Sequence, residues 1–244
     1  MAPDQNIQDG NRAVLIGLSQ KGYPLYVTTN NNIISAATLA PASYGPAEGT
    51  GLNLSGSTAA LKGKIAIWDG GRVLGTHLEL AGRVVQKDNP SALSDHSTHV
   101  TGTMIATGVN PVARGMSFGA QQLLAYDFNN DVSEMSGAAS GLLISNHSYG
   151  ALAGWNLNTD NNHWEWYGNT GDTADYKFGY YDDQSREWDS IAYNAPDYLI
   201  VKSVGNNRDE NGPAVDSPYD AFNARGVMAP AGNRPPGDQQ QRRI

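Results

Sequence analysis

Three residues of this 244-residue chain, Asp69, His96 and Asn206, combine a side chain that can move a proton or stabilise a negative charge with a place at the end of a predicted strand or the start of a predicted helix. Asp69 and Asn206 each follow an apolar run, and His96 opens a segment with helical spacing. A carboxylate beside an imidazole fixes the ring's tautomer and favours its charged form, so Asp69 and His96 could be an orienting acid and a general base. The amide of Asn206 could donate a hydrogen bond to an oxyanion without adding charge.

The segments around these residues alternate between strand-like and helical patterns. We predict extended segments at 13–18, 24–29, 64–68, 78–85, 121–126, 142–146 and 198–204, the last of which reads as the clearest buried strand. We predict helices at 33–40, 96–107, 134–141 and 185–194. This alternation predicts an α/β fold with a mostly parallel sheet. Ligands of such sheets bind beyond the carboxyl ends of the strands, which is where Asp69 and Asn206 lie.

The segment that begins at His96 has the features of a helix N-terminus. Ser94 or Asp95 is predicted as the N-cap, and an apolar stripe begins at Val100. We expect Gly102 to allow this helix to pack closely on the sheet. The sequence thus predicts that His96 is held at the mouth of a short helix.

Composition excludes several classes of protein. The net charge is −8 and there is no basic cluster beyond the last residues, which argues against a nucleic-acid partner. No run approaches the roughly 20 apolar residues of a membrane span, so we expect no membrane partner. The chain has no cysteine, which excludes disulfides, thiolate metal sites and a cysteine nucleophile. The N-terminus has no signal-peptide pattern.

Two stretches suggest how the chain is divided. Residues 41–56 are rich in Gly, Pro and Ser and read as a linker, so we place a boundary near residue 50. Residues 1–50 would be an N-terminal extension or propeptide-like segment with its linker, and 51–244 the main domain. Residues 151–182 read as irregular and carry many Trp and Tyr residues. We expect these aromatics to form a small local core; the alternative is a wall for bulky substrate side chains.

Four motifs, in this order, resemble the signatures of subtilisin-like serine peptidases (subtilases), and in particular secreted subtilases of the Bacteroidetes type. They are Trp-Asp-Gly-Gly at 68–71, Ser-Asp-His-Ser-Thr-His-Val-Thr-Gly-Thr at 94–103, Ser-Asn-His-Ser-Tyr-Gly at 145–150 and Val-Lys-Ser-Val-Gly-Asn at 201–206. The resemblance covers roughly residues 50–210. It implies a subtilisin-like three-layer α/β fold, hydrolysis of peptide bonds by acyl transfer, a polypeptide substrate, and a secreted or extracellular protein.

The resemblance also implies a role for each matching residue. Asp69 corresponds to the triad aspartate, His96 to the general base and Asn206 to the oxyanion-hole donor. The residues Ser148, Tyr149 and Gly150 correspond to the strand that binds the substrate through its main chain, by β-augmentation.

One part of the family pattern is absent. Subtilases carry their nucleophile in a Gly-Thr-Ser-Met-Ala motif, and Gly-Thr-Ser occurs nowhere in this sequence. The only serine after Asn206 is Ser217, within a turn-like segment. We therefore expect an incomplete catalytic domain that stops before its nucleophile and is inactive alone. A sheet without its last strands exposes an edge, so we expect marginal stability, self-association or binding of a complementing C-terminal segment.

Two other functions stay open from the sequence. One is a degenerate subtilase that binds peptides without turnover. The other is a metal hydrolase that uses the His-x-x-His pair His96 and His99. We expect no cofactor. The residues Asp127, Asn129, Asn130 and Asp131 have the oxygen chemistry for structural Ca²⁺, but their spacing fits no known loop, and a solvated turn is the favoured interpretation.

Overall fold

The computed structural model describes residues 5–7, 12–19, 22–29, 54–172, 174–206, 213 and 218. The chain divides into two compact units. Unit 1 comprises Met1–Asn30, Tyr149–Tyr181 and Ser203–Ile244, and unit 2 comprises Asn31–Ser148 and Asp182–Lys202. The predicted helix at 33–40 and most of the predicted linker lie outside the described residues.

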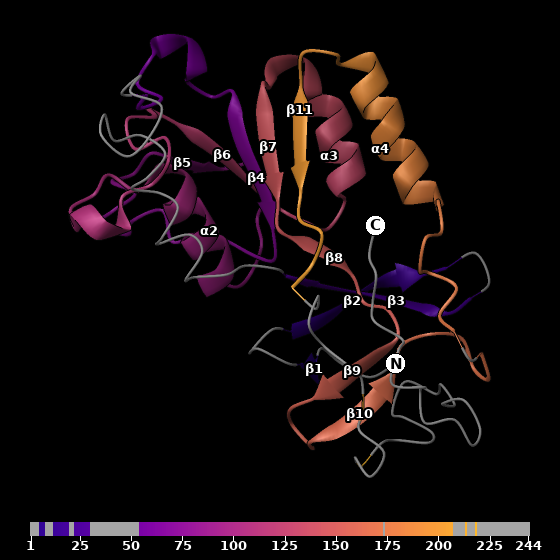
Figure 1. The fold of residues 1–244 in the computed structure, drawn as a ribbon. Coiled ribbons are helices and arrows are strands. Elements are labelled where there is room, and N and C mark those ends of the chain that lie inside the picture. Colours follow the sequence, from indigo (N-terminus) through magenta and orange to yellow (C-terminus); the bar gives the residue numbers. More distant parts are fainter. Residues whose placement is uncertain are drawn as a thin grey trace. The chain divides into compact units, whose positions relative to one another are not determined.

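Unit 2 is built on a parallel sheet of five strands in the order β11-β7-β4-β6-β5 (Figure 1). The strands are β4 (Ile65–Asp69), β5 (Val84–Gln86), β6 (Leu123–Asp127), β7 (Ile144–His147) and β11 (Leu199–Lys202). All five residues of β4 are buried, as expected for the central strand of a parallel sheet covered on both faces.

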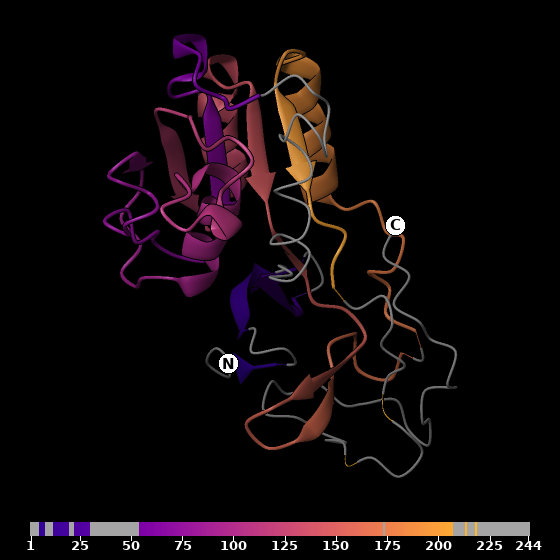
Figure 2. The same cartoon turned by 60° about the vertical axis from the view of Figure 1, so that its left-hand side comes forward.

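Helices cover both faces of this sheet. The α-helices are α2 (Asp95–Ile105), α3 (Asp131–Ala138) and α4 (Asp183–Asn194), and short 3₁₀ turns lie at Ala59–Leu61, Pro111–Ala113 and Ala139–Gly141. Side chains alternate between the faces of a strand. Ile67 shares a core with Val100 of α2, whereas the neighbouring Trp68 donates a hydrogen bond to Glu134 of α3. The helix α3 contacts α4, and Trp188 of α4 lies against His147 of β7, so both helices belong to the face opposite to α2 (Figures 1 and 2). The three-layer α/β fold predicted from the sequence is confirmed.

The predicted helix at 96–107 is confirmed as α2, which ends two residues earlier than expected. Ser94 is the N-cap, and its side chain accepts the backbone N–H of Ser97 at 3.0 Å. At the other end, the N–H groups of Gly115 and Met116 donate to carbonyl oxygens of Ala106 and Thr103. These bonds satisfy carbonyls that the helix terminus would otherwise leave unpaired.

The expected role of Gly102 is wrong. A Cβ built on Gly102 meets no described atom within 4 Å, so this glycine makes no close contact with the sheet. The close approach occurs at Gly115 instead, where a Cβ would lie 2.5 Å from the backbone nitrogen of Ala106. Packing against α2 therefore needs a glycine in the segment that follows the helix, not in the helix itself.

Two strand predictions in unit 2 need correction. The segment 78–85 is not extended throughout: only β5 is a strand, because Ala81 and Gly82 adopt left-handed backbone conformations that form turns before it. The segment at 198–204 is not a buried strand. Among the described residues, β11 pairs with β7 only and stands at the edge of the sheet, and the side chains of Leu199 and Val201 are 58% and 41% exposed.

Unit 1 contains an antiparallel sheet in the order β1-β2-β3-β8 and a separate hairpin. The strands are β1 (Gln5–Asn6), β2 (Arg12–Leu18), β3 (Pro24–Thr29) and β8 (Tyr149–Ala151), and the hairpin pairs β9 (Trp155–Asn158) with β10 (His163–Trp166). The prediction that 151–182 is irregular is therefore wrong for the hairpin. Trp155 and Trp166 are buried together, which confirms for these two the expected local aromatic core.

Within the described residues, none of the helices combines the length and apolar character needed to cross a membrane.

Candidate active site

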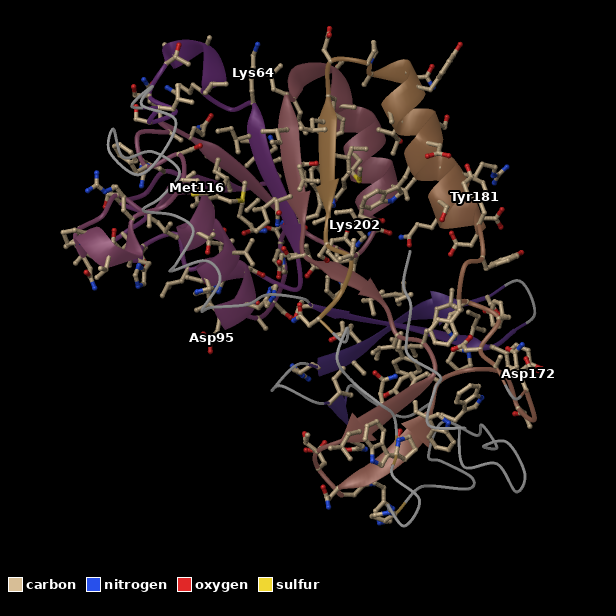
Figure 3. All side chains as sticks on the ribbon, in the orientation of Figure 1. Lys64, Asp95, Met116, Asp172, Tyr181 and Lys202 are labelled. Carbon is tan, nitrogen blue, oxygen red and sulfur yellow. The ribbon has the colours of Figure 1, made fainter. Side chains whose placement is uncertain are left out.

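The candidate site lies at the carboxyl end of the parallel sheet in unit 2. Asp69 is the last residue of β4, and His96 is the second residue of α2. Figure 3 shows Lys64, just before β4, and Asp95, the first residue of α2, at opposite ends of this sheet. Asp69 stands two residues after Ile67, so its side chain faces the same side as α2. Because side chains alternate between the two faces of β4, the Asp69 carboxylate lies on the face that is covered by α2, the helix that carries His96.

Asp69 and His96 form a direct contact. Oδ1 of Asp69 lies 2.7 Å from Nδ1 of His96, and the Asp69 side chain is 1% exposed. A contact of this length between an imidazole and a buried carboxylate is a charge-assisted hydrogen bond in which Nδ1–H donates. Nε2 of His96 has no hydrogen-bond partner among the described residues. The pair predicted from the sequence is therefore assembled, and its outer ring nitrogen is buried and makes no hydrogen bond to the described residues.

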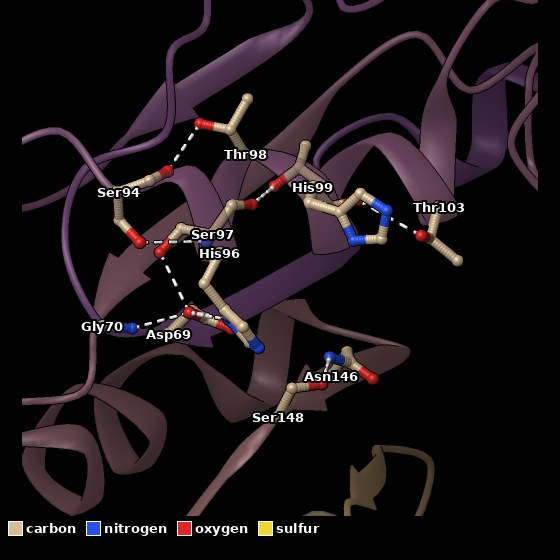
Figure 4. Close-up of polar contacts among 11 residues, drawn as sticks. Asp69, Gly70, Ser94, His96, Ser97, Thr98, His99, Thr103, Asn146 and Ser148 are labelled. Carbon is tan, nitrogen blue, oxygen red and sulfur yellow. Dashed lines mark hydrogen bonds and ion pairs between the residues drawn. The ribbon is translucent and has the colours of Figure 1, made fainter. Parts of the chain in front are cut away.

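Two further donors converge on the same carboxylate oxygen (Figure 4). The backbone N–H of Gly70 donates to Oδ1 of Asp69 at 2.8 Å, and the hydroxyl of Ser97 donates to it at 3.0 Å. Ser97 was not singled out from the sequence. Its signal was its place directly after His96 and on the stripe of α2 that faces the sheet with Val100 and Thr101, where a polar side chain needs a partner.

The backbone holds the start of α2 against the loop that follows β4. The N–H of Arg72 donates to Ala92 O, and the N–H of Ser94 donates to Arg72 O, both at 2.9 Å. Gly71 has φ +109°, and a Cβ there would lie 3.1 Å from Cβ of Ser94. A glycine is needed at this crossing for both reasons. The separation of Asp69 and His96 is thus set by main-chain bonds and not only by their own contact.

His99 lies one helical turn after His96 but does not join it in a metal-ligand cluster. Within the described residues, no three His, Cys, Asp or Glu side chains are grouped as metal ligands. Burial, and then the nearby charge of His96, lower the pKa of His99. Nδ1 of His96 is already bound to Asp69. The geometry therefore supports the acid–base pair better than the His-x-x-His metal site.

The polar turn after β6 uses its oxygens internally. Oδ1 of Asp127 accepts the backbone N–H of Asn129 at 2.9 Å and also binds the Asn129 side chain. Oδ1 of Asp131 accepts the N–H of Val132 at 2.7 Å. These are local turn and helix-start contacts, and Asp131 is buried and not solvated.

The predicted substrate-binding residues begin at the end of β7. The hydroxyl of Ser148 accepts a hydrogen bond from the Asn146 side chain at 2.8 Å, within unit 2. Tyr149 and Gly150 belong to unit 1, where they form most of β8. β8 is an edge strand, and within the described residues it pairs with β3 only.

The register of β8 shows which of its backbone groups face outward. The N–H of Leu152 donates to Tyr26 O of β3 at 2.8 Å. Hydrogen-bonded residues alternate in an antiparallel pair, so Gly150 faces β3 in the same way. The backbone groups of Tyr149 and Ala151 therefore point away from β3.

Asn206 lies in an exposed bend after β11 and belongs to unit 1. Gly205 before it has φ +99°, which gives the sharp turn expected at this strand end. The structure thus brings Asp69 and His96 together within unit 2. Asn206, Tyr149 and Gly150 lie in the other unit, and their roles stay predictions.

Comparison with known proteins agrees with this geometry. The model of the Subtilase family (Peptidase_S8) matches residues 64–235, which is more than half of the chain. No curated protein and no solved structure matches the chain. The matched region contains the parallel sheet, α2, α3, α4 and the Asp69–His96 contact at the carboxyl end of the central strand. The chain therefore belongs to the subtilase family.

Proposed function

We propose that this chain supplies His96 as general base and Asp69 as its orienting carboxylate to a serine-type endopeptidase domain, which hydrolyses peptide bonds by acyl transfer, and that the chain is inactive alone because it lacks the Gly-Thr-Ser nucleophile motif. The observation that carries the proposal is the 2.7 Å contact between Oδ1 of Asp69 and Nδ1 of His96 in a subtilase domain. Family membership supports a polypeptide as the substrate and a secreted location.

The contact determines which ring nitrogen can do chemistry. Nδ1–H donates to Asp69, so Nε2 carries the lone pair of the neutral ring. Nε2 can take the proton of a serine hydroxyl while that oxygen attacks the substrate carbonyl carbon. Asp69 stabilises the imidazolium that forms. His96 then gives the proton to the departing amine, and water repeats the sequence on the acyl ester.

The remaining roles follow from the family resemblance. A peptide would add a strand along the outer edge of β8, where the backbone groups of Tyr149 and Ala151 face away from β3, and Ser148 would extend this binding strand. The amide of Asn206 would donate to the oxyanion. Asn206 is exposed in the bend that follows β11, as this role requires.

The nucleophile is a separate question, because Gly-Thr-Ser occurs nowhere in the 244 residues. We expect a fluorophosphonate probe to leave this chain unlabelled. Stoichiometric labelling, with the modified residue located by mass spectrometry, would show instead that another serine serves as nucleophile.

Affinity labelling tests the base and the binding strand without any nucleophile. A peptidyl chloromethyl ketone would alkylate Nε2 of His96, forming a carbon–nitrogen bond and releasing chloride. We expect the label on His96 in preference to His99 or His77. An excess of the parent peptide should protect it. Asp69→Asn should slow the labelling, because an amide no longer holds the neutral ring in the tautomer with its lone pair on Nε2.

Equal labelling of His77, which lies on an exposed turn, would contradict the proposal. So would labelling of His96 that the parent peptide does not reduce. His99 is the internal control, since it lies on the same helix but is not a member of the predicted triad.

The second candidate function is peptide binding without turnover, which the absence of Gly-Thr-Ser favours. Titration of a labelled peptide against Ala151→Pro tests the groove, because this change removes an outward-facing N–H, and proline is tolerated on edge strands. Gly150→Pro is a poorer test, since that N–H faces β3. Binding that Ala151→Pro abolishes, with no cleavage product by mass spectrometry, would assign a binding module.

A further inference from the structure

The hydroxyl of Ser97 makes a contact that the other hydroxyls of its helix do not make. Thr98, Thr101 and Thr103 each donate back to the carbonyl oxygen four residues earlier, at 2.7, 2.7 and 3.2 Å. This is the usual habit of Ser and Thr inside a helix. Ser97 donates instead to Oδ1 of Asp69 at 3.0 Å. The Ser97 hydroxyl therefore bonds to the Asp69 carboxylate and not to the helix carbonyl that serves the other hydroxyls of α2.

The contact is fully enclosed. Ser97 is 0% exposed and Asp69 is 1% exposed. An ionised carboxylate can only accept, so the proton of the Ser97 hydroxyl lies between the two oxygens. Hydrogen bonds to a charged group in such surroundings are stronger than bonds between neutral groups. The bond is thus well placed to change the properties of Asp69.

The atom that accepts is also the atom that His96 uses. Oδ1 of Asp69 lies 2.7 Å from Nδ1 of His96 and receives the Gly70 N–H at 2.8 Å as well. Each added donor takes up part of the negative charge on this oxygen. The pull of Oδ1 on the Nδ1 proton is weaker than it would be with fewer donors, and the imidazolium gains less from its partner.

We propose that Ser97 is a positioning residue that sets the basicity of His96 by holding Oδ1 of Asp69 and reducing its negative charge. The inference rests on the proposed function in so far as Asp69 and His96 are taken as the acid–base pair. Ser97 touches neither substrate nor nucleophile and acts only through the carboxylate.

Titration of His96 by NMR tests this directly. We expect Ser97→Ala to move the midpoint of the His96 NMR signals to higher pH than in the native chain, since the carboxylate loses a donor and pairs more strongly with the imidazolium. Thr101→Val is the matched control: it removes an equally buried hydroxyl from the same helix, but one that bonds to Ser97 O and not to Asp69. We expect this control to leave the His96 titration unchanged.

A conservative variant makes the result independent of folding defects. Ser97→Cys keeps a weak donor at the same place, so we expect a smaller rise in the pKa of His96 than with alanine. If the alanine variant does not fold, the cysteine variant carries the test. An unchanged or lowered pKa of His96 in the folded variants would overturn the inference, as would an equal rise with Thr101→Val.

The titration needs no nucleophile and no peptide, so its outcome is separable from that of the proposed function. A raised pKa in Ser97→Ala together with failure of chloromethyl ketone labelling would leave the inference standing and remove the peptidase assignment. An unchanged His96 titration in Ser97→Ala together with specific labelling of His96 would remove the inference and leave the proposed function standing.

Discussion

The indole nitrogen of Trp68 donates a 3.0 Å hydrogen bond to Oε2 of Glu134, on the face of the sheet opposite to α2. Trp68 also stacks on Tyr126 and on His147, whose positions are level with it on the two neighbouring strands. Because Trp68 directly precedes Asp69 in β4, this stack anchors the strand end that carries the carboxylate. Two ionisable groups in this layer, Glu134 and His147, have pKa values far from their ordinary ranges, and each gives a test.

Glu134 should make stability fall as the pH rises toward neutral. Burial raises the pKa of Glu134 to about 7, with Asp88 and other nearby carboxylates adding to the effect and the Trp68 bond opposing it. A raised folded-state pKa contributes stability that is complete below about 4.5 and is lost as the pH passes through about 7. We expect Glu134→Gln to gain stability relative to the native chain as the pH goes from 5 to 8, measured by denaturant unfolding.

The control for this series is Glu187→Gln, which changes an exposed glutamate on α4. The difference in free energy of unfolding between Glu187→Gln and the native chain should stay constant from pH 5 to 8, whereas the difference for Glu134→Gln should change. Parallel curves for all three proteins would contradict the assigned pKa of Glu134.

His147 should stay neutral under all mildly acidic conditions. Its ring is buried, stacks on Trp68, lies against Trp188, and binds the hydroxyl of Ser145 through Nε2 at 2.7 Å. Burial, and then the charge of Lys202, lower the pKa of His147 to about 3. Its NMR signals should therefore not shift between pH 8 and 5.

The same group predicts a loss of stability in acid. The unfolded chain takes up a proton on His147 below about 6.5, and the folded chain does not until about 3, so the free energy of unfolding should fall across that interval. A titration of the His147 signals with a midpoint near 6.5 would show that the ring is accessible, contrary to the structure.

Gly102 and Gly115 should respond in opposite directions to alanine. Gly102→Ala should raise the free energy of unfolding by up to about 1 kcal/mol, because the added methyl meets open space and alanine favours the helix. Gly115→Ala should lower it by about 1–3 kcal/mol, because the methyl would meet the backbone at the end of α2. Denaturant unfolding of the two variants measures both, and a shared sign would disprove this account of how α2 packs.

The edge strand β11 should promote association between molecules. Leu199 and Val201 are exposed on one face of β11, whose outer edge has no partner strand among the described residues. We expect concentration-dependent association in sedimentation velocity, and we expect Leu199→Lys to weaken it. Tyr193→Lys is the control, since Tyr193 is 85% exposed but lies on α4. A native chain that stays monomeric at every concentration would refute the prediction.

Much of the candidate site could be predicted from the sequence because its signals are local. A buried apolar run that ends in Asp69 marks the carboxyl end of a strand, and Ser94 with His96 marks the start of a helix. Strand and helix periodicity need only a few neighbouring residues to be recognised. The family's motifs then fixed which two of these ends belong together.

Other features depend on which distant segments become neighbours, and only the tertiary structure decided them. Ser97 reaches Asp69 across 28 positions of the chain. Gly115, and not Gly102, meets the end of α2 because the chain turns back along that helix. β11 has the apolar composition of an interior strand but is exposed because of its place in the strand order. Composition and spacing determine which elements form; contact across the sheet determines what each side chain does.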